Sequence, residues 1–310
     1  MVFTSFQMNP NKASQTARFV SNGIYWVSQQ PHLKREVPPE LARYTAEITR
    51  RLEIDRSIFG ADTARRLLLF KAKLMQVVSI PGIYLHQLIR KRYIESIASE
   101  TLTKGVRQLV VIGAGFDTLS LRLSAEIPGC RVIEVDHPAT QQVKRAALEE
   151  FRLPIGHCHF VPADLSEESL TSALSQSPAY DPTEATLFIA EGLTMYLDEL
   201  KIRALLASIV AQNQTSKFLF TYMQEATPKR YHFQHTRPAT LLWLALRNER
   251  FTWGIKPAAL SEFLGDAGFR LQEHCTSEEL RLRFLTEANH SAVLALGENI
   301  ALASQVQTHT

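Results

Sequence analysis

The sequence comprises 310 residues, 45% of them hydrophobic and 21% charged, which is typical of a soluble globular chain with a substantial core. A formal net charge of +3 is too small to indicate nucleic acid or an anionic membrane as a partner. Three cysteines without metal or redox spacing, no apolar signal core in residues 1–12 and no apolar run of membrane-spanning length lead us to expect a soluble, cytoplasmic protein.

Residues 1–104 are predicted to form an N-terminal helical cap. Leu67, Phe70, Leu74 and Val78 recur at helical spacing, and a Pro-Gly pair at residues 81–82 ends that helix. A second helix is predicted over residues 84–98, with its apolar residues on one face. The chain shows no internal repeat.

The core of the protein is predicted over residues 105–223. Short apolar runs predict strands at residues 109–112, 131–135, 158–162, 186–190 and 217–222. They alternate with helices, which indicates a mostly parallel sheet covered on both faces. Residues 257–297 are predicted to complete a seven-stranded sheet with strands at 269–274 and 292–296, and residues 298–310 are predicted to be a loose tail.

A glycine turn after the first predicted strand indicates a nucleoside-type cofactor. Gly113, Ala114 and Gly115 stand between that strand and a helix, so backbone amides can approach a ligand there. About twenty residues later the second strand ends at Asp136, whose carboxylate suits the two hydroxyls of a ribose. Thr118 occupies the place of the third dinucleotide glycine, and Asp117 would repel a pyrophosphate but not a cationic sulfonium. These features favour S-adenosylmethionine.

Four blocks of sequence carry a resemblance to a known family. Residues 110–118, 134–138, 161–165 and 190–197, in this order, resemble the leucine carboxyl methyltransferase family. That family includes protein-phosphatase carboxyl methyltransferases and many bacterial small-molecule O-methyltransferases. The resemblance implies the α/β, Rossmann-like seven-stranded sheet of a class I methyltransferase, with an antiparallel final strand and S-adenosyl-L-methionine as the cofactor.

The resemblance also implies a set of cofactor-binding residues. It places Arg90, with Arg92 as the alternative, at the methionyl carboxylate, and it places Asp164 and Leu165 at the adenine. From the residues alone, Asp164 is also suited to cap a helix, and both roles can hold. Residues 13–17 resemble a segment that folds near the cofactor. The predicted cofactor-binding set is Arg90, Gly113, Ala114, Gly115, Asp117, Asp136, His137, Asp164, Leu165 and Glu191.

Residues 224–256 are predicted to form a lid over the substrate. They mix basic and aromatic residues without strand alternation, and the alternative is a peripheral helical pair with a solvated charge run. Arg230 and Arg237 could hold a carboxylate in bidentate geometry, and with Glu191 and Tyr196 they complete the predicted catalytic set. No third ligand accompanies the histidines at 232 and 235, so we predict no metal site.

The sequence predicts an O-methyltransferase that esterifies the carboxylate of a small molecule, such as a polyketide or another secondary metabolite. A carboxylate is already ionised at neutral pH, and the four blocks offer no general base near the methyl group. The alternatives are a hydroxyl O-methyltransferase that uses His232 or His235 as a base, a protein C-terminal carboxyl methyltransferase, a nicotinamide-dependent oxidoreductase and a non-catalytic binding protein. Neither nucleic acid nor a membrane is expected as a partner, and the sequence does not indicate an oligomeric state.

Overall fold

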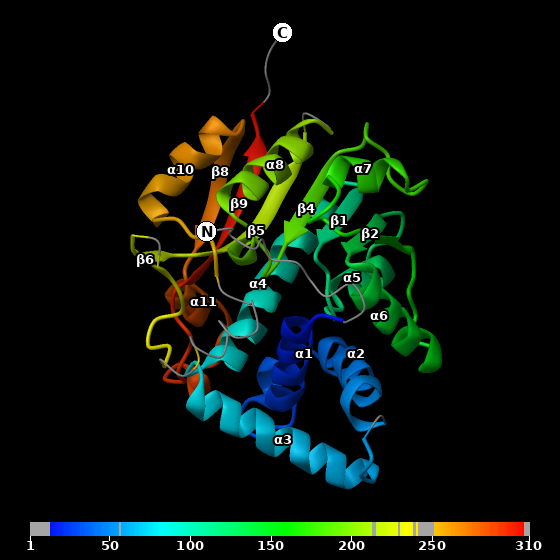
Figure 1. The fold of residues 1–310 in the computed structure, drawn as a ribbon, viewed down its shortest axis with the longest axis vertical. Helices are drawn as coiled ribbons and strands as arrows, with labels where there is room; N and C mark the ends of the chain where they lie inside the picture. Colours follow the sequence, from blue (N-terminus) through cyan, green and yellow to red (C-terminus); the bar gives the residue numbers. More distant parts are fainter. Residues whose placement is uncertain are drawn as a thin grey trace.

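A seven-stranded sheet forms the centre of the protein (Figure 1). The computed structural model describes residues 13–306 except 56, 213–214, 229, 238–239 and 241–250. The strand order is β3-β2-β1-β4-β5-β9-β8, and β9 runs antiparallel to both of its neighbours, as predicted. The strands are β1 (Gln108–Ile112), β2 (Arg131–Asp136), β3 (Cys158–Pro162), β4 (Thr186–Ala190), β5 (Lys217–Met223), β8 (Phe269–Cys275) and β9 (Glu298–Gln305).

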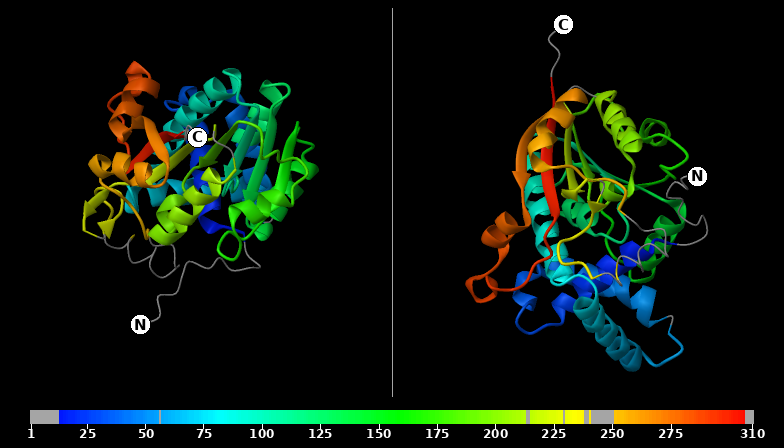
Figure 2. Two further views of the ribbon diagram at one scale, coloured as in Figure 1. Left: turned by 90° about the horizontal axis from the view of Figure 1, so that it is seen from above. Right: turned by 60° about the vertical axis from the view of Figure 1, so that its left-hand side comes forward.

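Helices cover both faces of this sheet, because alternate strand residues point to opposite sides. On one side the strands pack against α7 (Leu170–Ser175), α8 (Glu199–Val210) and α10 (Pro257–Asp266). The other side is covered by α4 (Ile83–Thr103), α5 (Leu119–Glu126), α6 (Pro138–Glu150) and α11 (Ser277–Phe284). Two further helices pack onto these: α1 (Gln15–Ser28) contacts α4, and α2 (Pro39–Thr49) contacts α5 and α6. The fold is therefore the predicted α/β class (Figure 2).

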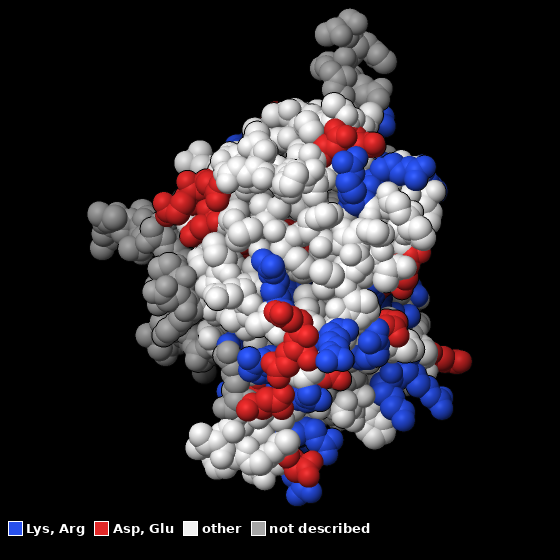
Figure 3. All heavy atoms as spheres, turned by 90° about the vertical axis from the view of Figure 1, so that its right-hand side faces the viewer, with Lys and Arg blue, Asp and Glu red and all other residues white. Residues whose placement is uncertain are grey.

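The N-terminal helices lie at one end of the sheet (Figure 1). Helix α3 (Ala61–Val78) crosses the lower edge of the molecule in Figure 1, and α4 runs from it up to the sheet. On the face shown in Figure 3, charged side chains of both signs gather over the lower half, where these helices lie. Among the described helices, none combines the length and apolar character that a membrane span requires.

The segment 224–256 begins with a small hairpin of β6 (Glu225–Thr227) and β7 (Arg230–Tyr231). The short helical turns are η1 (Lys34–Glu36), η2 (Arg50–Ile54), η3 (Thr194–Tyr196) and η4 (Glu287–Asn289). Much of the predicted lid, including Trp243, lies outside the described residues.

The last strand corrects the sequence prediction. Residues 292–296 are not a strand, and residues 298–305, predicted to be part of a tail, form β9 in the sheet. The apolar segment instead packs against the turn before α4, where a Cβ on Gly82 would lie 2.2 Å from the Val293 carbonyl oxygen. Gly82 has a φ of +74°, which glycine adopts without strain.

A buried ion pair joins β2 to α6. The Lys144 ammonium lies 2.7 and 2.8 Å from the two carboxylate oxygens of Glu134, and both side chains are about 1% exposed. Ser120 donates a hydrogen bond to the same carboxylate. Each charge therefore depends on the other for its compensation inside the protein.

Replacing Lys144 with Met should lower the free energy of unfolding by about 3–5 kcal/mol, because the Glu134 carboxylate would stay buried without its cation. Denaturant unfolding measures the change. The double variant Glu134→Gln/Lys144→Met should recover part of the loss. Arg203→Met, which removes an exposed ion pair with Glu199, should change stability by less than about 1 kcal/mol. Equal losses in Lys144→Met and Arg203→Met would contradict this account.

Candidate functional site

The candidate site lies at the carboxyl ends of β1 and β4, where the strand order reverses direction. Such switch points are where open α/β sheets bind ligands. Gly113 and Gly115 follow β1 and Gly192 follows β4, all with positive φ. A Cβ on Gly115 would lie 3.0 Å from the Cβ of Ala17, so the first turn of α1 covers the glycine turn. The N-terminal segment therefore packs against the glycine turn.

Asp136 stands at the end of β2, beside the glycine turn. Its two carboxylate oxygens accept hydrogen bonds from the backbone amides of Gly115 at 2.5 Å and His137 at 2.6 Å. Burial nevertheless raises the pKa of Asp136 to about 6, against the effect of these amides. The carboxylate is thus fixed in place but under-compensated, which suits a ligand that brings hydroxyl donors.

His137 and Asp164 lie beside Asp136. His137 caps α6 by accepting a hydrogen bond from the Ala139 amide at its Nδ1, and its Nε2 lies 3.7 Å from Asp164 Oδ2. Asp164 Oδ1 accepts hydrogen bonds from the amide and the hydroxyl of Ser166. The alternative that Asp164 caps a helix is wrong, because α7 begins at Leu170 and Ser169 caps it. The predicted ribose and adenine residues are therefore neighbours.

Arg90 lies at the centre of a buried ionic network. Its Nε and Nη2 donate to Glu191 Oε1 at 2.9 and 2.6 Å, and its Nη1 donates to both oxygens of Glu298 at 2.8 and 2.7 Å. His86 Nε2 lies 2.9 Å from Glu298. Burial by itself would raise the pKa of Glu298, but Arg90 and His86 outweigh it and lower this pKa to about 2.

A second cation, Lys91, extends the network to the glycine turn. Its ammonium lies 3.0 Å from Glu191 Oε1 and 3.1 Å from Asp117 Oδ2. Burial would raise the pKa of Asp117, but Lys91 reverses this and lowers it. Glu191 Oε2 is buried and has no hydrogen-bond partner among the described residues. The network thus brings two cations, Arg90 and Lys91, to three carboxylates, and one carboxylate oxygen has no partner among the described residues.

The structure distinguishes between the two arginines proposed for the cofactor. Arg92 points away from the site and donates to Glu36 and to the Phe284 carbonyl. Arg90 is at the site, although Glu191 and Glu298 already occupy much of its guanidinium, so a ligand carboxylate would share it. Sequence reasoning missed Lys91 and Glu298. The position of Lys91 next to Arg90 was a usable signal, whereas nothing marked Glu298.

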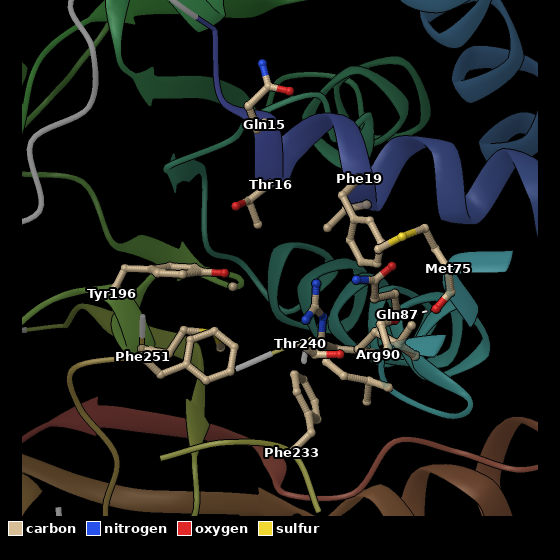
Figure 4. A pocket seen from close by; sticks show the side chains of 16 residues that line it. Gln15, Thr16, Phe19, Met75, Gln87, Arg90, Tyr196, Phe233, Thr240 and Phe251 are labelled. Atoms are coloured by element: carbon tan, nitrogen blue, oxygen red, sulfur yellow. Dashed lines mark hydrogen bonds between the residues drawn. The ribbon is translucent and has the colours of Figure 1, made fainter. Parts of the chain in front are cut away.

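An apolar cavity adjoins this network (Figure 4). Arg90 lines it, so the cavity and the ionic network share this residue, and Gly192, the neighbour of Glu191, lines it as well. Phe233, Thr240 and Phe251 from the predicted lid segment line it as well. Tyr196 and Phe251 lie on one side in Figure 4, and Phe19 and Met75 on the other. The carboxamide oxygen of Gln87 is buried at the cavity without a hydrogen-bond partner among the described residues.

Four of the polar lid residues are not brought to this cavity. Arg230 and Arg237 are exposed and do not line it, so the structure gives no support to their predicted contact with an acceptor. His232 and His235 do not line it either, and His232 Nδ1 lies 2.9 Å from the Phe233 carbonyl. A guanidinium that has no buried carboxylate as a partner is more stable in solvent, and this explains why both arginines are exposed. Glu191 and Tyr196 are the predicted catalytic residues that lie at the site.

The Glu298→Gln substitution should destabilise the protein in a pH-dependent way. Because the pKa of Glu298 is lowered from 4.5 to about 2, its charge stabilises the fold above pH 4.5, and this contribution is lost as pH falls toward 2. At neutral pH the free energy of unfolding of the variant should be about 3–5 kcal/mol lower than that of wild type. This difference should become smaller as the pH falls. Denaturant unfolding of the variant and of wild type, at several pH values from neutral down toward 2, measures the difference. Glu278→Gln, at an exposed ion pair, is the control, and a difference independent of pH would contradict the assignment.

Comparisons with known proteins bear on the same region. A Bacillus subtilis (strain 168) protein, YktD, provisionally named an S-adenosyl-L-methionine-dependent methyltransferase, is 30% identical over 184 residues, or 58% of this chain and 59% of that protein. A Streptomyces coelicolor protein with the same provisional description is 35% identical over 127 residues, 40% of this chain and 44% of that protein. The chain thus spans less than two thirds of the length of these relatives.

Two solved structures share the fold. A DUF574 family protein from Streptomyces avermitilis has a TM-score of 0.59 at 13% identity, covering 95% of this chain and 98% of that one. A candidate methyltransferase from Thermobifida fusca has a TM-score of 0.54 at 17% identity, covering 87% and 98%. The sequence model described as leucine carboxyl methyltransferase matches residues 53–210, about half of the chain. This match runs from the helical cap to the end of α8, and the chain therefore belongs to the leucine carboxyl methyltransferase family.

Proposed function

We propose that this protein is an S-adenosyl-L-methionine-dependent methyltransferase that forms a methyl ester on the carboxylate of a largely apolar small molecule. The observation that carries the proposal is the composition of the cavity beside the ionic network. Its described lining contains no Asp, Glu, His or Lys, and its ionisable side chains are Arg90 and Tyr196. The curated relatives in the comparison are named for the same cofactor.

The acceptors around the glycine turn fit this cofactor. Asp136 suits a ribose diol, and the unpaired Glu191 Oε2 suits the ammonium of a methionyl group. The carboxylates of Asp117, Asp136 and Glu191 around the glycine turn favour a ligand with a cationic sulfur. A dinucleotide fits less well, because Ala17 covers the Gly115 backbone that a pyrophosphate would need to approach.

The chain's own residues would act by binding, alignment and exclusion of water. The cofactor supplies an electrophilic methyl group on its sulfonium. The ionic network fixes Glu191 and Gly192 at the boundary of the cavity, while Phe19, Tyr196 and Phe251 hold the acceptor in apolar surroundings. Alignment of this kind can lower the activation free energy of a reaction by up to about 7–11 kcal/mol. The Gln87 carboxamide offers the acceptor a polar contact within the cavity.

The lack of a base in the described lining supports a carboxylate acceptor. A hydroxyl acceptor must lose a proton during attack, whereas a carboxylate, with an ordinary pKa of about 4, is already ionised. The predicted alternative that His232 or His235 acts as a base gains no support, since neither lines the cavity. The apolar lining favours a small molecule with an extended hydrocarbon or aromatic body over a charged protein terminus.

The protein should bind S-adenosylmethionine and its demethylated product, but not NAD, in titration calorimetry. Asp136→Ala should weaken cofactor binding at least tenfold, because hydrogen bonds to a charged group contribute about 1.5–3 kcal/mol each. Asp266→Ala, at an exposed acidic position, should bind like wild type. Heat from NAD but from neither sulfur nucleoside would refute the cofactor assignment.

The acceptor class can be tested with methyl-labelled cofactor and a panel of apolar carboxylic acids and their alcohol analogues. Only the acids should become labelled, and mild alkali should release the label as methanol, because an ester is hydrolysed whereas an ether is stable. The rate should be nearly flat from about pH 6 to 9, since no proton must be removed. Label that resists alkali, with a rate that rises through the histidine range, would identify a hydroxyl acceptor instead.

A further inference from the structure

Helix α3 turns an apolar stripe away from the protein. Leu67, Phe70, Leu74 and Val78 are 53, 64, 49 and 40% exposed. Because successive residues of an α-helix are turned by about 100° and rise by about 1.5 Å, these four side chains fall within an arc of about 80° and a length of about 16 Å. We refer to these four residues as the α3 stripe. The helix buries its other face through Ala64, Leu68 and Ala72.

The α3 stripe lies at the edge of the molecule and continues beyond the helix. Ile58 and Phe59, in the loop before α3, are 94% and 51% exposed. In Figure 1 and in the right view of Figure 2, α3 lies at the lower extremity, with no described element beneath it. A flat surface could therefore reach the whole stripe at once. Six large apolar side chains exposed along one segment are more than the scattered exposure usual for a soluble surface.

Basic side chains border the α3 stripe on both sides. By the same helical geometry, Lys71 lies next to one edge, and Arg66 and Lys73 lie next to the other. All three are exposed, and none has an ion pair within the described residues. The single acidic residue of the helix, Asp62, lies 3.9 Å from Arg65 in the first turn. The helix thus has four basic residues against one acidic residue, and three of its cations are available.

We propose that the α3 stripe docks onto the surface of an anionic lipid bilayer, with α3 lying in the plane of the interface. An amphipathic helix with an apolar face bordered by Lys and Arg binds there by burying its apolar side chains among the lipids while its cations meet anionic headgroups. A second copy of the chain is a poorer occupant. In a two-fold contact each α3 would face another α3, and Arg66, Lys71 and Lys73 would repel their counterparts.

The same helix also forms a wall of the cavity. Met75 and Ser79 line the cavity, while Leu74 and Val78, each the immediate sequence neighbour of one of them, belong to the exposed stripe. A docked α3 would therefore hold the cavity next to the bilayer, where amphiphilic carboxylic acids partition. The docking itself does not rest on the proposed function. The expectation of no membrane partner rested on the net charge of the whole chain, which does not resolve the charge carried by one helix.

Sedimentation with unilamellar vesicles tests this proposal. The full-length protein should bind vesicles of phosphatidylglycerol and phosphatidylcholine at least tenfold more tightly than vesicles of phosphatidylcholine alone. The difference should shrink when salt is raised, because the screening length falls from about 10 Å at 0.1 M to about 3 Å at 1 M. The triple variants Leu67→Gln/Phe70→Gln/Leu74→Gln and Arg66→Gln/Lys71→Gln/Lys73→Gln should each lose at least tenfold in affinity for the anionic vesicles.

A matched control uses apolar residues that are exposed elsewhere. Leu200 and Leu282 are 80% and 68% exposed and lie outside α3, so Leu200→Gln/Leu282→Gln should bind vesicles like wild type. The charge variant changes only surface side chains, which keeps the test valid if the apolar variant fails to fold. Equal binding to both kinds of vesicle, or an equal loss in the control, would overturn the proposal. So would a concentration-dependent dimer that the apolar variant abolishes, because the stripe would then be a protein interface.

Discussion

The buried contacts of Arg90 tie together three parts of the chain that are far apart in sequence. Arg90 belongs to α4, Glu191 follows β4, and Glu298 begins β9. A guanidinium in this position is tolerable only because two carboxylates meet it, and each carboxylate in turn depends on the arginine. The helical cap, the centre of the sheet and its antiparallel strand are therefore held in one arrangement. The glycine at 192 and the cavity wall take their positions from the same contacts.

Two different environments meet at this arginine. On the side of the glycine turn, the carboxylates of Asp117, Asp136 and Glu191 are held in fixed positions. On the other side, aromatic and aliphatic residues from α1, α3 and the segment after β5 enclose an apolar space. A reaction between a cationic donor and an apolar acceptor needs such a boundary, because water would solvate the nucleophile and weaken the electrostatic attraction. The sequence motifs contain residues from the polar side of this boundary and few from the apolar side.

Local sequence patterns were sufficient for most of the fold but not for the contacts made between distant segments. The strands β1 to β5 were predicted to within one or two residues, because each is a short apolar run with a clear end. The prediction failed at β9, where Glu298 and Asn299 open a buried strand. They are buried because Arg90 and Tyr222 meet them, and a single sequence does not show that pairing. The outward direction of Phe70 could not be read from its spacing either.

The position of Glu298 near the end of the described chain has a consequence for how the protein is made. Arg90 leaves the ribosome 208 residues before its partner carboxylate, and β9 must then enter the sheet between β5 and β8, which have already been synthesised. Until that moment β5 presents an open edge, and the guanidinium lacks half of its compensation. Folding during translation therefore cannot be completed from the N-terminus onward. A chain that ends before β9 would leave Arg90 without one of its two carboxylates and the edge of β5 unpaired.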